Sequence, residues 1–124
     1  MGHGESKLVK QVGAKGYFGK VTVQAEPLDG DTDEVIVDFD RTIPKRWQSG
    51  ASFGIEYVLD HVTKRKIFPK GGRIRVLTIG GHEVDTNNVV IAFVAAHALY
   101  DALKIQPTKQ PVFDESTGVF SFPK

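Results

Sequence analysis

The stretch Arg73–Thr86, RIRVLTIGGHEVDT, carries much of the fold information in the chain. In its first half, Ile74, Val76 and Thr78 alternate with side chains that fall on the opposite face, which is the period of a half-buried strand. Gly80 and Gly81 then interrupt this pattern and open a polar loop. The stretch therefore predicts a strand that runs directly into an exposed loop.

Working outward toward the C-terminus, Val89–Leu103 is apolar almost all round, which is typical of a helix buried against a sheet. Thr86 or Asn87 is expected to cap this helix. Beyond it the chain is expected to be irregular as far as Gly118, with a final short strand over 119–122.

Working outward toward the N-terminus, a helix is expected around Trp47–Val62, with Trp47 as its anchor on the sheet. Three strands are predicted before it, the first as an edge strand that ends in a Gly-rich turn at 13–16. The second and third are expected to pair as a hairpin. Their ranges are Ser6–Gln11, Tyr17–Glu26 and Val35–Asp40.

Strands followed by helices in this order indicate an α+β fold, a two-layer α/β sandwich with helices on one face of the sheet. The length of 124 residues fits one domain, so residues 1–124 are expected to form a single unit. The absence of Cys excludes disulfides and thiolate chemistry. No apolar run is long enough to cross a membrane and no signal peptide is evident, which favours the cytoplasm.

Charge is distributed in blocks, although the formal net charge is only +1. Residues 21–40 carry seven acids and no bases, whereas residues 41–75 carry nine bases and two acids. Such blocks can form opposite poles or can pair with each other after folding, and the pattern leaves both open.

Three stretches resemble domain IV of the translational GTPase elongation factor G. Lys15–Val21, KGYFGKV, is similar to the family's R-G-Q-Y-G-H-V, and Ile43-Pro44 is similar to its V-I-P. The third stretch, Arg75–Thr86, looks like R-L-H-F-G-S-Y-H-D-V-D-S. The likeness covers Lys7–Leu103, most of the chain.

The resemblance implies a free-standing β-β-β-α-β-α module with a left-handed βαβ crossover. It also implies that two loop tips, here Gly13–Gly19 and Gly80–Asn88, contact the ribosome or structured RNA. The chain lacks a G-x-x-x-x-G-K-[ST] motif, so we expect neither GTP binding nor a GTPase engine. No cofactor or metal is expected, and the phosphate loop of kinases that share this fold is missing, so an enzyme is not expected.

The candidate contact residues are the polar, glycine and aromatic residues of the two loops, namely Lys15, Gly16, Tyr17, His82, Glu83, Asp85, Thr86, Asn87 and Asn88. Stacking on a base by Tyr17 or Phe18 is expected, with one of these two rings facing the core. His82-Glu83-Val84-Asp85 is not an H-E-x-x-H metal motif, which leaves a plain loop or an RNA-contacting tip.

A basic patch is also predicted, made of Lys64, Arg65, Lys66, Lys70 and Arg73, with Arg75 beside it. It is interpreted either as a solvated helix end or as a phosphate contact. The Gly13-x-x-Gly16-x-x-Gly19 spacing indicates a tight loop that needs positive φ, because a dinucleotide fingerprint would open a helix. A protein-interaction or small-ligand module that kept the fold remains the alternative function.

Overall fold

The computed structural model describes residues 2–62 and 64–124, and the side chains of residues 63–65 lie outside that description. It contains six strands and three helices within this part of the chain. In chain order they are β1 (His3–Val12), β2 (Lys15–Pro27), β3 (Val35–Phe39), α1 (Lys45–His61), α2 (Lys64–Ile67), β4 (Gly72–Gly80), α3 (Asn88–Leu103), β5 (Val112–Asp114) and β6 (Val119–Ser121).

Four strands form one mixed sheet in the order β1-β2-β4-β3. β1 pairs with β2 and β2 with β4, both antiparallel, whereas β3 pairs with β4 in parallel. The predicted hairpin between β2 and β3 is therefore wrong. The hairpin is β1–β2, and β3 lies at the far edge of the sheet, because β1 and β4 already occupy the two edges of β2.

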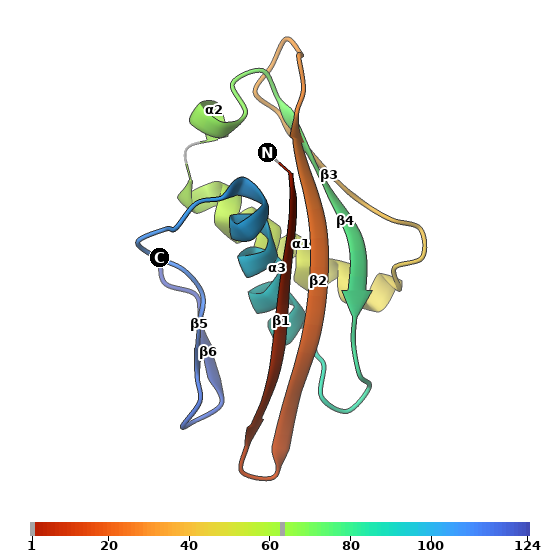
Figure 1. Cartoon of the computed structure of the whole chain (residues 1–124), viewed down its shortest axis with the longest axis vertical. Coiled ribbons are helices and arrows are strands. Elements are labelled where there is room, and N and C mark those ends of the chain that lie inside the picture. The colour runs from red at the N-terminus through yellow and green to blue at the C-terminus, as the bar shows by residue number, and fades with distance from the viewer. Residues whose placement is uncertain (1, 63) are drawn as a thin grey trace.

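The connection from β3 to β4 is a crossover that carries α1 and α2. α1 and α3 cover one face of the sheet and leave its other face open, as Figure 1 shows. This arrangement confirms the predicted α+β fold with helices on one face. The left-handed sense of the crossover stays a prediction.

The two long helices pack closely because α1 carries glycine where α3 crosses it. A Cβ placed on Gly50 would lie 2.6 Å from the carbonyl oxygen of Asn88, and one on Gly54 would overlap the carbonyl of Ala92. These glycines lower the intrinsic helix propensity of α1, so the helix depends on packing. Trp47, which is 8% exposed, anchors the start of α1 in the core.

A β-bulge interrupts the pairing of β2 with β4. Val23 faces Val76 and Thr22 faces Thr78, so Leu77 has no partner on β2. The extra residue reverses the alternation of β4, because two residues on the bulged strand oppose one on its partner. Thr78 is consequently exposed and Ile79 packs against the core, which corrects the predicted placement of these two side chains.

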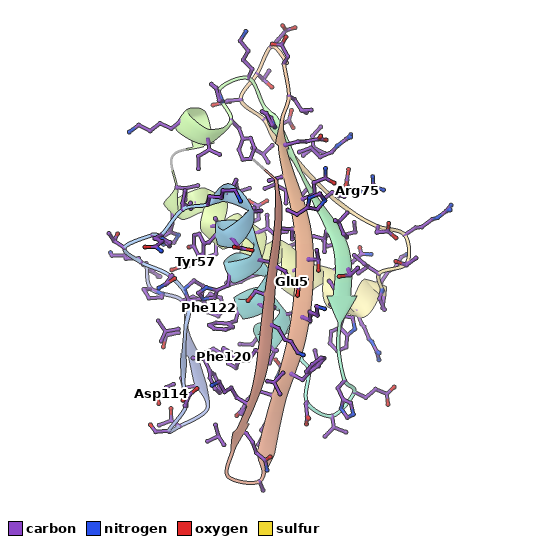
Figure 2. All side chains as sticks on the ribbon, in the orientation of Figure 1. Glu5, Tyr57, Arg75, Asp114, Phe120 and Phe122 are labelled. Carbon is purple, nitrogen blue, oxygen red and sulfur yellow. The ribbon has the colours of Figure 1, made fainter. Side chains whose placement is uncertain are left out.

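The C-terminal segment folds back as a second, two-stranded sheet formed by β5 and β6. Its aromatic side chains point from the hairpin toward the helices, where Phe120 meets Phe93 at 5.3 Å and Phe122 meets Tyr57 at 5.6 Å between ring centroids (Figure 2). The Tyr57 hydroxyl donates a hydrogen bond to the carbonyl of Pro123. The predicted final strand is therefore present, and it belongs to a hairpin that covers a third side of α3.

His97 on α3 has a structural role. Its Nε2 lies 2.8 Å from the carbonyl oxygen of Pro111, at the start of the hairpin. Asp101, one turn later, accepts a hydrogen bond from the backbone N–H of Glu5 at 3.0 Å. None of the helices in the described part of the chain is long and apolar enough to span a membrane.

Candidate nucleic-acid interface

The β1–β2 turn and the loop between β4 and α3 lie at the same end of the sheet (Figure 1). The first is tighter than the predicted loop over Gly13–Gly19, because Val12 already pairs with Lys15 and only Gly13 and Ala14 remain between the strands. Of the three spaced glycines, only Gly13 has positive φ, at 61°. The interpretation as a loop that needs positive φ is thus right for Gly13 and wrong for Gly16 and Gly19.

Gly16 and Gly19 lie within β2 and are required for space. A Cβ on Gly16 would lie 2.8 Å from Oδ2 of Asp85, a residue of the second loop. A Cβ on Gly19 would lie 2.8 Å from Cγ1 of Val90 on α3. Both glycines therefore allow the segment that follows β4 to pack directly on β2.

Hydrogen bonds hold the second loop to β2. The Thr86 hydroxyl donates to the carbonyl of Phe18 at 2.6 Å and accepts from the backbone N–H of His82 at 2.6 Å. The N–H of Phe18 in turn donates to the carbonyl of Asp85 at 3.0 Å. The two predicted loops are consequently joined into one hydrogen-bonded unit, which we call the tip and define as residues 9–18 and 80–88.

Two of the candidate contact residues have structural roles in the tip. Thr86 is buried, 7% exposed, and its hydroxyl is engaged on both sides. Asn87 caps α3, because its side-chain oxygen accepts a hydrogen bond of 2.9 Å from the N–H of Val90. The prediction that Thr86 binds a ligand is therefore corrected. Asn87 and Asn88 are both exposed, and for them ligand contact stays a prediction.

The exposed charges of the tip are mixed. The Lys15 ammonium lies 5.6 Å from the ring centroid of Tyr17, a cation–π distance, and the Lys15 side chain is exposed. His82 and Glu83 are exposed, and Glu83 lies 3.9 Å from the guanidinium of Arg46 on α1. Within the described residues, the tip therefore offers one cation without a carboxylate partner, an imidazole and acidic groups.

Tyr17 and Phe18 point to opposite faces of the sheet, as expected of neighbours in a strand. Tyr17 faces the helices, where its ring packs edge-on against Phe113 at 5.1 Å and Phe120 at 5.8 Å. Phe18 lies on the open face, opposite Val9 of β1. Tyr17 is thus not free to stack on a base, and of these two rings only that of Phe18 is available.

A groove of about 490 Å³ lies at the tip. Its lining combines apolar, glycine and polar residues, namely Val9, Lys10, Gln11, Gly16, Tyr17, Phe18, Gly81, His82 and Asp85. Val9 and Gln11 were missed at the sequence level, because β1 appears there only as a weak edge strand. Their cross-strand pairing with Phe18 and Gly16 is what brings them into the site.

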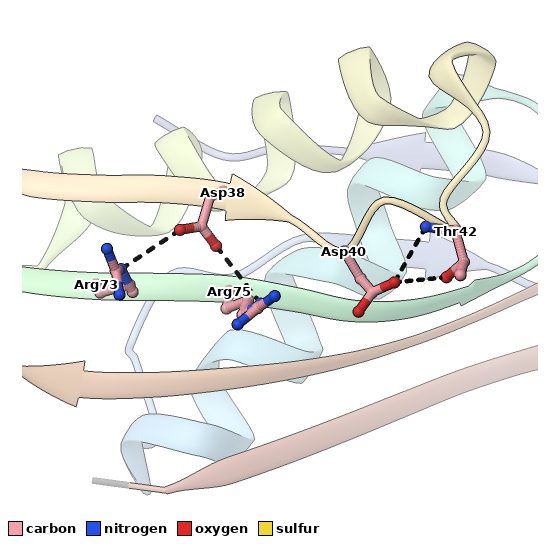
Figure 3. A network of polar contacts seen from close by, with 5 residues as sticks. All are labelled: Asp38, Asp40, Thr42, Arg73 and Arg75. Carbon is pink, nitrogen blue, oxygen red and sulfur yellow. Dashed lines mark hydrogen bonds and ion pairs between the residues drawn. The ribbon is translucent and has the colours of Figure 1, made fainter.

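The predicted basic patch lies away from the tip, since Figure 1 places α2 at the opposite end of the molecule from the β1–β2 turn. Two of its cations are paired. Lys70 lies 3.4 Å from Asp29. Arg73 lies 3.3 Å from Asp38, which also lies 3.9 Å from Arg75, as Figure 3 shows. Lys66 is exposed, and the side chains of Lys64 and Arg65 lie outside the described residues.

These pairs join the acidic block 21–40 to the basic block 41–75, so the two blocks pair in part after folding. Asp40, beside them, accepts bonds from the backbone N–H and the hydroxyl of Thr42, and these bonds hold the pKa of its carboxyl below the ordinary 3.8 (Figure 3). The interpretation of this region as an anion-binding surface loses support for Arg73 and Lys70.

The helix ends opposite the tip carry a pair of phenols. Burial raises the pKa of Tyr57 above its ordinary 10.0 and, with the charge of Tyr57 as a second cause, raises the pKa of Tyr100 to about 12. Both phenols stay protonated at neutral pH. The Tyr57 hydroxyl donates to the carbonyl of Pro123, whereas the Tyr100 hydroxyl is buried without a hydrogen-bond partner among the described residues. Among residues 2–62 and 64–124, no cluster of three His, Asp or Glu side chains that could hold a metal ion is found.

No protein-family model matches the chain. Elongation factor G of Thermotoga maritima is 27% identical over 121 residues, which is 90% of this chain and 16% of that protein. Elongation factor G of Aquifex pyrophilus is 28% identical over 103 residues, 82% of this chain and 15% of that protein. A crystal structure of a Thermus thermophilus protein superposes with a TM-score of 0.61 and 25% identity, over 78% of this chain and 14% of that one.

The chain thus spans about one-sixth of the length of these curated relatives. The resemblance in sequence runs through nearly the whole chain, and the resemblance in fold through most of it. The expected likeness to domain IV of elongation factor G is confirmed.

Proposed function

We propose that this elongation factor G-like chain is a non-catalytic module that binds the ribosome or structured RNA through its tip. The observation that carries the proposal is that hydrogen bonds join the two loops, from the Thr86 hydroxyl to the carbonyl of Phe18 and from the N–H of Phe18 to the carbonyl of Asp85. Loops that act on a common partner need a fixed mutual position, because ordering them at the moment of binding would cost free energy. The relatives are translation factors by name, which supports the same partner.

The chemistry of the tip favours hydrogen bonding over charge. Lys15 is its one exposed cation without a described carboxylate partner, while Glu83 and Asp85 repel phosphate. Each phosphate that a protein neutralises contributes about −0.9 to the slope of log K against log salt. We therefore expect a shallow slope of about −1, with contacts from His82 and Asn88 to bases or ribose hydroxyls providing the rest.

Co-sedimentation of the purified chain with bacterial ribosomes over a salt series tests the proposal. The unchanged chain is expected in the ribosome pellet at low salt. Lys15→Ala with His82→Ala is expected to shift it to the supernatant without lowering the melting temperature. The matched control is Lys66→Ala with His3→Ala, which changes the same residue types away from the tip.

A chain that stays in the supernatant at every salt concentration contradicts the proposal. Equal loss of binding and of melting temperature in the tip variant would instead mean that the two side chains are structural. Neither GTP binding nor catalysis belongs to the proposed function, and the cytoplasm is its proposed location.

The alternative is a protein-interaction or small-ligand module. It is favoured by an apolar groove of about 420 Å³ between α1, α3 and the C-terminal hairpin, where Phe53 is 57% exposed and Val89 is 46% exposed. Exposed apolar surface of this kind often marks a binding site. Ligand-dependent rises in melting temperature that are lost in Phe53→Ser, together with no ribosome binding, would favour the alternative.

A further inference from the structure

The tip groove opens on the face of the sheet that carries no helix. Its floor comes from the cross-strand pairs Val9–Phe18 and Gln11–Gly16 of the β1–β2 hairpin. Its wall comes from Gly81, His82 and Asp85 of the second loop. The volume of about 490 Å³ lies in the range of small-ligand sites.

The floor is largely apolar, with Gln11 as a polar side chain. Val9 is 60% exposed although it is a large aliphatic residue, and the ring of Phe18 lies beside it on the same face. Gly16 adds no side chain, and the Asp85 carboxylate lies over it, 2.8 Å from where a Cβ would be. Phe18 is half-buried on a sheet face that no helix covers, and aromatic rings on such faces are where proteins stack unpaired bases.

The polar groups of the groove are chiefly acceptors and neutral donors. The Asp85 carboxylate lies beside Gly16, and no cation among the described side chains lies within ion-pair distance of it. Lys10, the cation in the lining, is paired with Glu115. The N–H of Val84 lies 3.4 Å from Nδ1 of His82, an arrangement in which Nε2 carries the ring proton and can donate.

A free carboxylate in a groove repels phosphate but accepts N–H groups of bases, as acidic side chains do from the amino group of cytosine. An apolar floor, a carboxylate and an imidazole together match the face and the edge of a nucleobase. In a duplex the faces of the bases are stacked and their pairing edges are occupied, so a paired base does not fit.

We propose that the tip groove binds one unpaired RNA base that carries an exocyclic amino group, with the base stacked on Phe18 and its amino group donating to Asp85. The inference rests on the proposed function and deepens it, because it names which part of an RNA the tip holds. In this proposal the RNA contacts the open face of the sheet as well as the ends of the two loops.

The test is a titration of the ¹⁵N-labelled full chain with two single-stranded hexamers, oligocytidylate and oligouridylate, followed by NMR. Cytosine and uracil have similar rings for stacking, but only cytosine carries the amino group. Oligocytidylate is expected to bind about fivefold tighter or more, because a matched base-edge contact discriminates by that order. The largest shifts are expected at the amides of Phe18, Gly16 and Gly81.

Three variants separate the two contacts. Phe18→Ala is expected to weaken oligocytidylate binding about fivefold or more, because stacking on the ring is lost, and Phe18→Tyr is expected to retain it. Asp85→Asn is expected to remove the preference for cytosine over uracil. Phe53→Ala, at an exposed phenylalanine on the helical side, is the matched control and is expected to leave both affinities unchanged.

The inference is overturned if neither hexamer binds at millimolar concentration, if the two bind equally well, or if an RNA duplex binds as tightly as oligocytidylate. It is also overturned if Phe18→Ala and Phe18→Tyr bind alike. Ribosome co-sedimentation run beside the titration keeps the two proposals apart. Ribosome binding without hexamer binding refutes the groove alone, and hexamer binding without ribosome binding refutes the ribosomal role of the chain.

Discussion

The hydroxyl of Thr86 donates a hydrogen bond of 2.6 Å to the carbonyl of Phe18, a residue 68 positions earlier in the chain. The same oxygen accepts the N–H of His82. One buried side chain thus fixes the shape of the second loop and its position on β2, and both proposals above depend on that position.

Thr86→Val keeps the shape of the side chain and removes both bonds, which leaves the N–H of His82 and the carbonyl of Phe18 without their partner. We expect a loss of about 1–3 kcal/mol in the free energy of unfolding, measured by urea denaturation, together with weaker ribosome association. Thr78→Val on the exposed face is the control, expected to change stability by less than about 0.5 kcal/mol. Equal stability of the two variants would mean that Thr86 does not hold the loop.

Gly54→Ala tests the close crossing of α1 and α3. Alanine raises helix propensity by about 1 kcal/mol, but its Cβ would overlap the backbone carbonyl of Ala92, which cannot rotate away. We expect a net destabilisation of about 2 kcal/mol, since overpacking opposes the gain in propensity. Ser49→Ala, on the same helix, is expected to be neutral or slightly stabilising. A stabilised Gly54→Ala protein would refute the tight crossing.

Phe120→Ala tests whether the C-terminal hairpin is part of the core. The half-buried ring contacts Tyr17, Phe93 and Phe113, so its loss is expected to cost about 2–3 kcal/mol, below the value for a fully buried ring. Calorimetric melting measures the effect. Val119→Ala, a neighbour that is 55% exposed, is the control and is expected to melt as the unchanged chain does. Equal melting of both variants would show that the hairpin is undocked in solution.

Thr42→Val tests the cause of the lowered pKa at Asp40. The backbone N–H of Thr42 still donates in the variant but the hydroxyl does not, so the pKa of Asp40 is expected to rise part of the way toward 3.8. When the pKa of a carboxyl is lower in the folded state, its ionised form stabilises the fold at pH values above the ordinary pKa. That contribution is lost as the pH falls through the folded-state pKa. Because its folded-state pKa is higher, the variant is expected to lose the stabilising contribution of Asp40 at a higher pH than the unchanged chain does.

Carboxyl-detected NMR titration reads the pKa of Asp40 directly. Ser116→Ala provides the matched case, because the hydroxyl and N–H of Ser116 hold the pKa of Asp114 low by the same geometry. Each substitution is expected to move only its own aspartate. Movement of Asp40 in Ser116→Ala would point to a general charge effect in place of the local bonds.

Local pattern was enough to predict the main elements. The apolar composition of 89–103 predicts α3, and the alternation before Gly80 predicts β4, because both elements bury a face that the sequence shows directly. The partner of β3 could not be predicted this way. The alternation of its side chains is compatible with any neighbouring strand. Its parallel pairing with β4 is accompanied by the ion pair of Asp38 with Arg73, two residues far apart in the chain.

The site was predictable in its location and less so in its detail. The likeness to a known domain placed both loops, but the orientation of Tyr17 depends on Phe113 and Phe120, which lie near the other end of the chain. Asn87 was predictable as a cap of α3, because its bond to the N–H of Val90 is local. Thr86 looks like an ordinary polar loop residue until its bond to Phe18 is known. Long-range contacts of this kind leave no local signature in the sequence.

Because of the bulge at Leu77, β4 contains one residue more than the part of β2 with which it pairs. Up to Val76 the even-numbered residues face the helices, and Ile79 faces them after the bulge. Removal of Leu77 would make Val76 and Thr78 neighbours in a regular strand, with Thr78 still outward and Ile79 still inward. Position 77 is therefore the point at which this strand can become one residue shorter without exchanging its two faces, so that the tip it leads into would keep its orientation.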